Sequence, residues 1–180
     1  QSKGTLNIGA AEGHEAAAAG FVDGGLNGIY FGHGDATLVF NHTSDDYEFD
    51  QTMFGSGATI KQLAGTTRLT GDSSLLDGTI YVTGGKLYAN GFLNIASVDV
   101  RDGGFFGGTG YVKDVVVGDG GVFSPGDTFG TIGLNGSLQI AEGGTLQIDL
   151  GPDGSDLAHL QADFTSATIV DGALLDVRLT

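Results

Sequence analysis

Serine and histidine are the residue types through which this chain could act as a catalyst, and the chemistry would be ester hydrolysis. Residues 71–75 read GDSSL, which places Ser73 beside an acid in a segment that begins with glycine. A serine nucleophile needs a histidine base that a carboxylate orients. The four histidines fall in expected loops with no such partner pattern: His14, His33, His42 and His159. We therefore interpret Asp72-Ser73 as a turn between strands, and we predict that the chain is not an enzyme.

Calcium binding is the second chemistry that a short segment suggests. Residues 32–38 read GHGDATL, which approaches the calcium-binding nonapeptide repeat but lacks one of its residues. The segment occurs once, whereas such a site needs stacked copies of the repeat. We therefore expect no metal site and no cofactor.

Polysaccharide cleavage is the third chemistry, and it would use a carboxylate cluster with a nearby base. Asp99 and Arg101 lie on one face of an alternating segment, and Asp102 follows them. One acid and one base on a strand more often form a surface ion pair. A polysaccharide-active enzyme therefore remains an alternative that only a cleft of converging carboxylates would favour.

The composition indicates a folded chain with an acidic surface. Of 180 residues, 40% are hydrophobic and 16% are charged, which excludes disorder. The 34 glycines follow no Gly-X-Y period, so collagen is excluded, and they stand where short apolar segments end and turns are needed. The net charge is −15 and the few Lys and Arg residues are scattered, so we expect no nucleic-acid partner. There is no cysteine, which excludes disulfides.

A short phrase of glycine or alanine, threonine or serine, and an aliphatic residue recurs along the chain. In three of its copies the aliphatic residues are Leu38, Ile60 and Ile80, which are separated by 22 and 20 residues. This interval suits one coil of a stack in which parallel strands lie about 4.8 Å apart, and about eight such coils would fit. The alternation predicts strands at residues 5–8, 29–40 (two strands), 136–140, 144–150, 157–160, 167–170 and 174–179. The alanine run at residues 16–19 could form one helical turn.

Residues 107–136 are the part around which we expect the fold to be organised, because a strand, a tight turn and a strand follow one another with no room for a helix. The turn motif is Ser124-Pro125-Gly126-Asp127. The residues expected to form the folding core are Val115, Val117, Leu134, Leu138, Ile140, Leu146, Ile148, Leu157 and Leu174. The aromatic cluster of this region comprises Phe105, Phe106, Tyr111, Phe123 and Phe129. We expect these rings to fill the coil or to stack on it in ladders, or else to form a plug that starts folding.

Five phrases follow one another in the C-terminal half of the chain. They are Gly108-Thr109-Gly110, the Pro-Gly turn at 124–127, Gly130-Thr131-Ile132, a glycine-led strand at 143–146, and Ser155-Asp156-Leu157. In this order, residues 107–180 resemble the C-terminal end of type V autotransporter passenger domains of the pertactin-like family. Residues 36–91 are similar to the tandem rungs that precede that end.

The resemblance implies a right-handed parallel β-helix, or β-solenoid, that forms one all-β, rod-like domain. Residues 1–103 would be rungs of the passenger stem, with residues 1–33 matching least, and residues 104–180 would be an autochaperone-like cap. The implied function is a non-enzymatic stem that promotes folding and outer-membrane translocation of the passenger and presents it at the Gram-negative cell surface. Its partners would be its own N-terminal passenger and a C-terminal outer-membrane β-barrel, so we expect the chain to be a fragment of a longer protein.

An adhesin module is the main alternative to a stem. In that case a lateral β-face of the chain would itself bind a host glycan or protein. A broad exposed aromatic or acidic stripe on one face would favour this alternative, whereas scattered Thr, Asn and Lys residues would not.

Overall fold

The computed structural model describes residues 4–22, 28–32, 35–94, 96–161 and 165–180, and this part of the chain is all-β without a helix. His33 and Gly34 of the calcium-like segment lie outside the described residues. The helical turn expected at residues 16–19 is wrong. Ala17 forms a bridge with His42 instead, and its carbonyl accepts a hydrogen bond from Thr43 N at 3.0 Å. A run of four alanines is too short to hold a helix against a strand end that offers backbone partners.

The strands form three sheets, which we number by size. The first sheet contains, in order, β1 (Gly4–Gly9), β3 (Ala36–Asn41), β5 (Met53–Ala64), β7 (Leu76–Val82), β10 (Ala96–Val100), β13 (Val115–Val117), β16 (Leu138–Ile140) and β20 (Ala167–Ile169), and β2 (Ile29–Phe31) also pairs with β5. The second contains β4 (Tyr47–Phe49), β6 (Thr66–Leu69), β8 (Lys86–Ala89), β11 (Phe105–Gly108), β14 (Val122–Pro125), β17 (Thr145–Gly151) and β18 (Gly154–Ser155), and β21 (Leu174–Leu179) also pairs with β17. The third contains β9 (Phe92–Leu93), β12 (Tyr111–Val112), β15 (Thr131–Leu134) and β19 (Leu157–Leu160).

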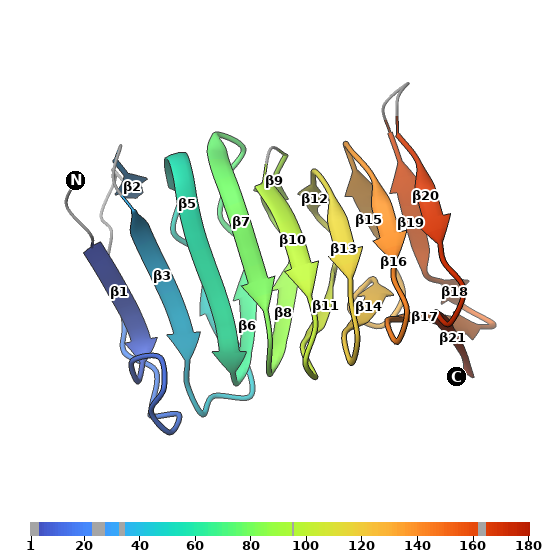
Figure 1. Ribbon diagram of the computed structural model, residues 1–180, viewed down its shortest axis with the longest axis horizontal. Coiled ribbons are helices and arrows are strands. Elements are labelled where there is room, and N and C mark those ends of the chain that lie inside the picture. Colours follow the sequence, from blue (N-terminus) through green and yellow to red (C-terminus); the bar gives the residue numbers. More distant parts are fainter. Residues whose placement is uncertain (1–3, 23–27, 33–34, 95, 162–164) are drawn as a thin grey trace.

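The chain passes through the three sheets in turn, and we call each pass a circuit. The strands β7, β8 and β9 lie in the first, second and third sheets, and β10, β11 and β12 repeat that order one position further along. Neighbouring circuits pair in parallel, as in the pairs β7–β10, β8–β11 and β9–β12. Figure 1 shows the result: strands of successive circuits lie side by side along the long axis, with the two chain ends at opposite ends. The same sheets continue across residue 103.

The register between circuits confirms the spacing of the recurring phrase. Leu38 lies opposite Ile60, and Ile60 lies opposite Ile80. The threonines of the same phrases, Thr37, Thr59 and Thr79, are also register partners and form a ladder on the outer face. The 22- and 20-residue intervals are therefore each one circuit of the stack.

The core lies between the three sheets and consists of inward-facing columns. One column in the first sheet contains Leu38, Ile60, Ile80, Val98 and Val115, all at most 1% exposed. Full burial of such side chains stabilises the fold by roughly 1.5–3 kcal/mol each. In the second sheet Phe106 and Phe123 stack at 5.8 Å between ring centroids. Alternating residues of each strand thus supply a continuous apolar interior.

A buried polar network interrupts this apolar interior at one corner. Gln62 occupies a core column position between Phe40 and Val82 and is fully buried. Its Oε1 accepts a hydrogen bond from Thr67 Oγ1 at 2.8 Å, and Thr67 Oγ1 lies 2.9 Å from His42 Nε2. Because the threonine proton points to Gln62, the His42 ring must carry its proton on Nε2. Nδ1 of His42 is buried and has no hydrogen-bond partner.

Candidate functional site

The segment considered for ester hydrolysis is a turn, as we interpreted it. Ser73 is 2% exposed, and its Oγ accepts a hydrogen bond from the backbone N of Met53 at 2.9 Å. The carboxylate of Asp72 accepts the backbone N–H of Ser74 at 3.1 Å, which is an Asx-turn contact. The expectation that all histidines stand in loops is wrong, because His159 lies in β19 and His42 forms a β-bridge with Ala17. The buried side chain of His42 also bonds to Thr67. These positions give Ser73 a structural role in the turn before β7.

Asp99 and Arg101, the residues considered for polysaccharide cleavage, form a surface ion pair at the end of β10. Arg101 Nε donates to Asp99 Oδ1 at 2.8 Å, and the guanidinium makes a second bond to the same carboxylate. Asp102 has a positive φ of 55° in the turn that follows β10. Among the described residues no group of three or more His, Cys, Asp or Glu side chains could hold a metal ion.

The residues expected to form the folding core occupy three kinds of position. Five are at most 5% exposed, namely Val115, Val117, Leu134, Leu138 and Ile140. Leu146 and Ile148 are half-buried on β17. Leu157 and Leu174 require a correction, because they are 52% and 57% exposed.

The correction at Leu157 and Leu174 follows from strand register. Leu157 pairs with the exposed Thr131, and Leu174 pairs with Thr145, so both leucines point outward. A shift of one residue along a strand exchanges the inner and outer faces. The neighbours Ala158 and Leu175 hold the inward positions of β19 and β21.

The turn motif at the end of β14 ties three circuits together. Gly126 has a φ of +88° and forms an antiparallel bridge with Gly108 of the preceding circuit, with both N–O distances 2.8 Å. Beyond it, Asp127 forms an ion pair with Arg68, which lies on β6 and 59 residues earlier in the chain. We name residues 126–130 the strap, because they reach back over the outer face of the second sheet.

The aromatic residues of the central region do not form one cluster. Phe106 and Phe123 stack inside the core, as above. On the outer faces, Phe105 lies against Tyr88 with ring centroids 5.7 Å apart, and Tyr111 stacks on Phe92 at 5.5 Å. Phe129 of the strap lies against the turn between β17 and β18. Strand alternation separates adjacent rings such as Phe105 and Phe106, so the rings form ladders inside and outside the stack.

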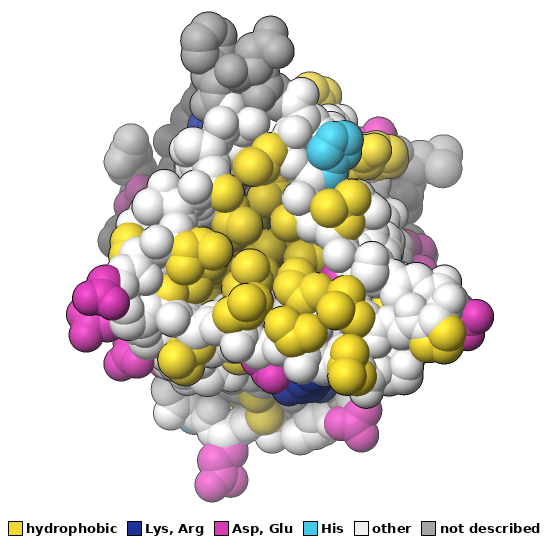
Figure 2. Space-filling model, turned by 90° about the vertical axis from the view of Figure 1, so that its right-hand side faces the viewer, with side chains coloured by type: hydrophobic (Ala, Val, Ile, Leu, Met, Phe, Trp, Pro, Cys, Tyr) yellow, Lys and Arg dark blue, Asp and Glu magenta, His cyan; other side chains and the backbone are white. Residues whose placement is uncertain are grey.

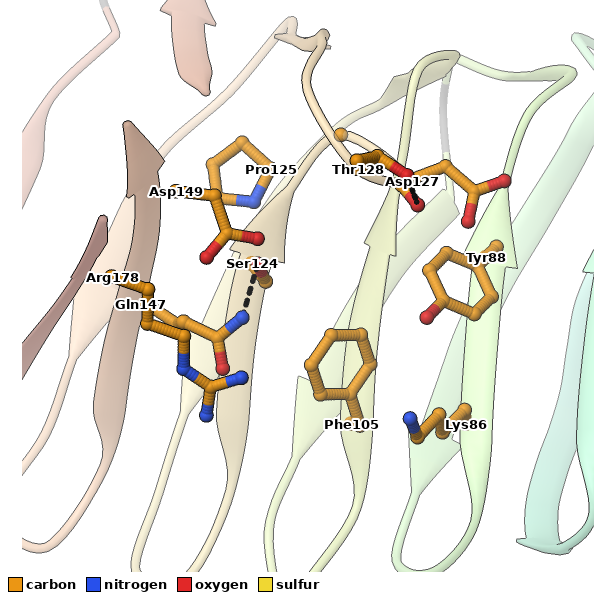
Figure 3. Close-up of a pocket in the computed structure, with 11 residues that line it drawn as sticks. Lys86, Tyr88, Phe105, Ser124, Pro125, Asp127, Thr128, Gln147, Asp149 and Arg178 are labelled. Carbon is orange, nitrogen blue, oxygen red and sulfur yellow. Dashed lines mark hydrogen bonds between the residues drawn. The ribbon is translucent and has the colours of Figure 1, made fainter. Parts of the chain in front are cut away.

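A groove of about 250 Å³ lies beside the strap on the outer face of the second sheet (Figure 3). It is lined by Lys86, Tyr88, Phe105, Ser124, Pro125, Gly126, Asp127, Thr128, Gln147, Asp149 and Arg178. Sequence reasoning identified the turn motif and Phe105 but missed Thr128, which follows the motif, and the residues that come from three other circuits. Tyr88 and Lys86 are separated from Gln147 by about 60 residues of chain and by two intervening strands.

The carboxyl group of Asp149, which lines the groove, lies near the buried carboxyl group of Asp156. Asp156 is 7% exposed, and its Oδ2 accepts the backbone N–H of Asp149 at 2.9 Å. Burial, with a contribution from the charge of Asp149, raises the pKa of the Asp156 carboxyl above its ordinary value. Oδ1 of Asp149 and Oδ1 of Asp156 are both buried without a hydrogen-bond partner.

The C-terminal end of the stack presents apolar side chains to solvent. Figure 2 views this end and shows hydrophobic side chains gathered in its middle, with acidic side chains mainly around the rim. Four residues at inward positions of the last circuit, which we name the end patch, are Ile169, Leu175, Val177 and Leu179, with exposed fractions of 63%, 66%, 48% and 85%. In the preceding circuit the partner of Ile169 is Ile140, which is fully buried. The end patch therefore has the pattern of a core layer without a layer over it.

Comparison with known proteins finds similarity to an autotransporter adhesin and to an uncharacterized lipoprotein, both bacterial. A stretch of 117 residues, 63% of this chain, is 36% identical to the adhesin BmaC autotransporter of Brucella suis biovar 1 (strain 1330). This similarity supports an autotransporter-related region. A stretch of 97 residues, 52% of the chain, is 37% identical to the uncharacterized lipoprotein YdeK of Escherichia coli K12. The matches span only 3% and 7% of the lengths of these relatives.

Other comparisons add no further assignment. No protein-family model matches the chain, and no solved structure matches it. Among the described residues there is no helix with the length and apolar character that a membrane span requires.

Proposed function

We propose that this chain is a section of a right-handed parallel β-helix that serves as the non-enzymatic stem of an autotransporter passenger. The stem promotes folding and outer-membrane translocation of the passenger and presents it at the Gram-negative cell surface. Its partners are its own N-terminal passenger and a C-terminal outer-membrane barrel, and residues 104–180 act as an autochaperone. The similarity to an autotransporter adhesin supports the class of protein.

The observation that carries the proposal is the end patch. A layer of inward-facing apolar side chains that are 48–85% exposed costs free energy, unless another layer covers it. The free edges of the last strands also carry unpaired N–H and C=O groups, which can template a further strand. In a stack where each circuit contacts only its neighbours, a folded circuit stabilises the next one. A stem that folds circuit by circuit during export needs such an end.

Two adjacent leucines on β21 test this proposal in the full-length parent protein. Leu174 and Leu175 are similarly exposed in this chain, at 57% and 66%, but Leu175 points inward and Leu174 points outward. If a further circuit covers the end, Leu175→Asp buries an unpaired charge and blocks folding. We expect Leu175→Asp to lower surface display and protease resistance strongly, and Leu174→Asp to leave both near the parental level. Equal display of the two variants would reject a covered end.

Deletion of residues 104–180 from the parent tests the autochaperone role directly. We expect the passenger to lose protease resistance and surface display, because no C-terminal circuits remain to template those before them. Supplying residues 104–180 as a separate chain should restore protease resistance. A passenger that folds and is displayed without this segment would show that the segment is not needed for folding.

An adhesin module is the second candidate function, and the groove favours it. A broad exposed aromatic or acidic stripe on a lateral face would favour this function; the groove is a smaller feature of the same kind, in which the rings of Tyr88 and Phe105 are half-buried. Tyr88 and Phe105 form an aromatic pair beside the carboxylates of Asp127 and Asp149 on one such face. If the deletion above abolished adhesion but not folding, the adhesin function would be preferred.

A further inference from the structure

A glycine lies beneath the strap at one edge of the groove. In the outward-facing column of the second sheet, Gly107 on β11 is the register partner of Tyr88 on β8 and of Ser124 on β14. Gly107 is buried, and a Cβ there would lie 2.5 Å from the carbonyl O of Ser124 and 3.0 Å from that of Gly126. The absent side chain therefore lets the strap lie close to β11, beside the rings of Tyr88 and Phe105 that line the groove.

Aromatic rings form one wall of this groove. The centroids of Tyr88 and Phe105 are 5.7 Å apart with planes inclined by 51°, and Figure 3 shows both rings standing on neighbouring strands. Lys86 Nζ lies 5.2 Å from the centre of the Phe105 ring, and Arg68 lies 4.6 Å from the centre of the Tyr88 ring. These two cation–ring contacts help to hold the rings in place. Because the two rings are already held in place, a ligand can make apolar contact with them at a low cost in conformational entropy.

Polar groups form the opposite wall. Gln147 is 5% exposed, and its Nε2 donates to Ser124 Oγ at 3.0 Å, which fixes the orientation of the amide. Asp149 contributes a buried carboxylate oxygen with no partner, and Figure 3 shows its carboxylate turned toward Ser124 and Gln147. Burying an oxygen of this kind without a donor costs roughly 1–3 kcal/mol. A ligand hydroxyl in the groove would supply the donor. Arg178, the register partner of Asp149, stands on the next strand.

The combination of groups identifies the class of ligand. We propose that the groove binds one pyranose ring of a neutral glycan, with the apolar face of the sugar on Phe105 and Tyr88 and its hydroxyls on Gln147 and Asp149. Sugar hydroxyls both donate and accept, and the groove offers acceptors on Asp149 and donors on Lys86. A volume of about 250 Å³ is slightly below the roughly 300–1,000 Å³ of drug-sized ligand sites, which suits a single ring.

The charge and the position of the groove disfavour other ligands. The net charge of −15 repels sulfated and other acidic glycans at long range, and within the groove the cations Lys86 and Arg178 are matched by the carboxylates of Asp127 and Asp149. An extended peptide that adds a strand needs a free sheet edge. The strands under the groove, β8, β11, β14 and β17, are each paired on both sides. A glycan needs no such edge, because it binds side chains on the face of the sheet.

A printed array of neutral, sialylated and sulfated oligosaccharides, probed with the intact 180-residue chain, tests the proposal. We expect binding to neutral oligosaccharides, followed in NMR titration by shifts confined to the groove residues on β8, β11, β14 and β17, the strap and Arg178 on β21. Phe105→Ala and the isosteric Asp149→Asn should each weaken binding at least about tenfold. The control is Tyr111→Ala, which removes one ring of an exposed pair on the third sheet and should leave affinity unchanged.

Three outcomes would overturn the proposal. They are absence of binding across all neutral oligosaccharides, a preference for acidic ones, or full affinity in both Phe105→Ala and Asp149→Asn. Circular dichroism shows whether each variant is folded. If Phe105→Ala does not fold, Asp149→Asn still tests the proposal, because asparagine keeps the shape of the aspartate side chain. The proposal goes beyond the stem function and does not depend on it. The stem function and glycan binding are separate if parent protein that carries either substitution is displayed normally but no longer binds glycan.

Discussion

Arg68 and Asp127 form an ion pair across the outer face of the second sheet, although 59 residues separate them in the chain. Arg68 also binds Asp46 through Nε at 2.5 Å and lies over the ring of Tyr88. Gly126 bridges the strap to β11, and the ion pair connects the strap to β6, which lies two circuits before β11. In a stack of this kind most contacts join neighbouring circuits. The ion pair instead links circuits whose strands do not pair with each other in the sheets.

We predict a measurable coupling between Arg68 and Asp127. In a double-mutant cycle with Arg68→Met and Asp127→Asn, the coupling free energy should be about 0.5–1 kcal/mol, because both side chains are about two-thirds buried and share a network. Urea unfolding of the four proteins measures it. The matched cycle on Arg101 and Asp99, a pair within one strand end, should give less. A coupling of zero for Arg68 and Asp127 would mean that the strap does not stabilise the stack.

Stability should fall as the pH drops below neutrality because of His42. Burial lowers the pKa of His42 below its ordinary value of 6.5, so the unfolded chain binds the proton more readily than the folded one. The free energy of unfolding should therefore be highest above pH 6.5 and decrease as the pH falls through 6.5 toward the folded pKa. The slope should approach about 1.4 kcal/mol per pH unit.

Urea unfolding at a series of pH values between about 7 and 5 checks this prediction. His42→Gln should reduce the slope, whereas His159→Gln, at an exposed position on β19, should retain it. Asp156 contributes with the opposite sign, since its raised pKa means that protonation stabilises the fold. The difference between His42→Gln and the parent isolates the histidine. An unchanged slope in His42→Gln would contradict the prediction.

Two glycines of one turn should differ sharply in their tolerance of a methyl group. A Cβ at Gly121 would lie 2.4 Å from the carbonyl O of Val100 in the preceding circuit, so something must shift. At Gly118 the nearest atom would be 3.7 Å away, which is ordinary contact. We expect Gly121→Ala to cost about 1–3 kcal/mol, as overpacking does, and Gly118→Ala to be nearly neutral. Thermal and urea unfolding measure both, and equal costs would be inconsistent with this close approach between circuits.

Charge at an inward position of the C-terminal circuits should prevent their folding. Leu138→Asp places an unpaired carboxylate where the side chain is 5% exposed, and Ile148→Asp does so at a half-buried site. We expect protease digestion to remove residues beyond about β13 in Leu138→Asp, and the parent protein to lose surface display. Leu157→Asp is the control, because the outward-facing Leu157 is 52% exposed. Resistance to protease equal to that of the unchanged chain would contradict a core role for Leu138.

The sequence by itself determined the strands and much of their stacking. Apolar and polar residues alternate, and glycines close each segment, so the strands predicted at residues 157–160 and 174–179 match β19 and β21. The recurring phrase also placed Leu38, Ile60 and Ile80 in one column. The alternation is local, and the three copies at Leu38, Ile60 and Ile80 lie 22 and 20 residues apart, so a linear pattern can reveal these features.

Only the tertiary structure decided what each face of the stack contains. The interval between parallel register partners varies from 17 residues, between Val98 and Val115, to 32, between Gly4 and Ala36. Because the loops differ so much in length, the sequence does not show which residues of neighbouring circuits pair. An error of one residue in the register exchanges the inner and outer faces of a strand, and Leu157 is such a case. The ion pair of Arg68 with Asp127 and the groove around Phe105 both join several circuits. They depend on register and loop geometry, which non-local backbone pairing sets and which no short segment encodes.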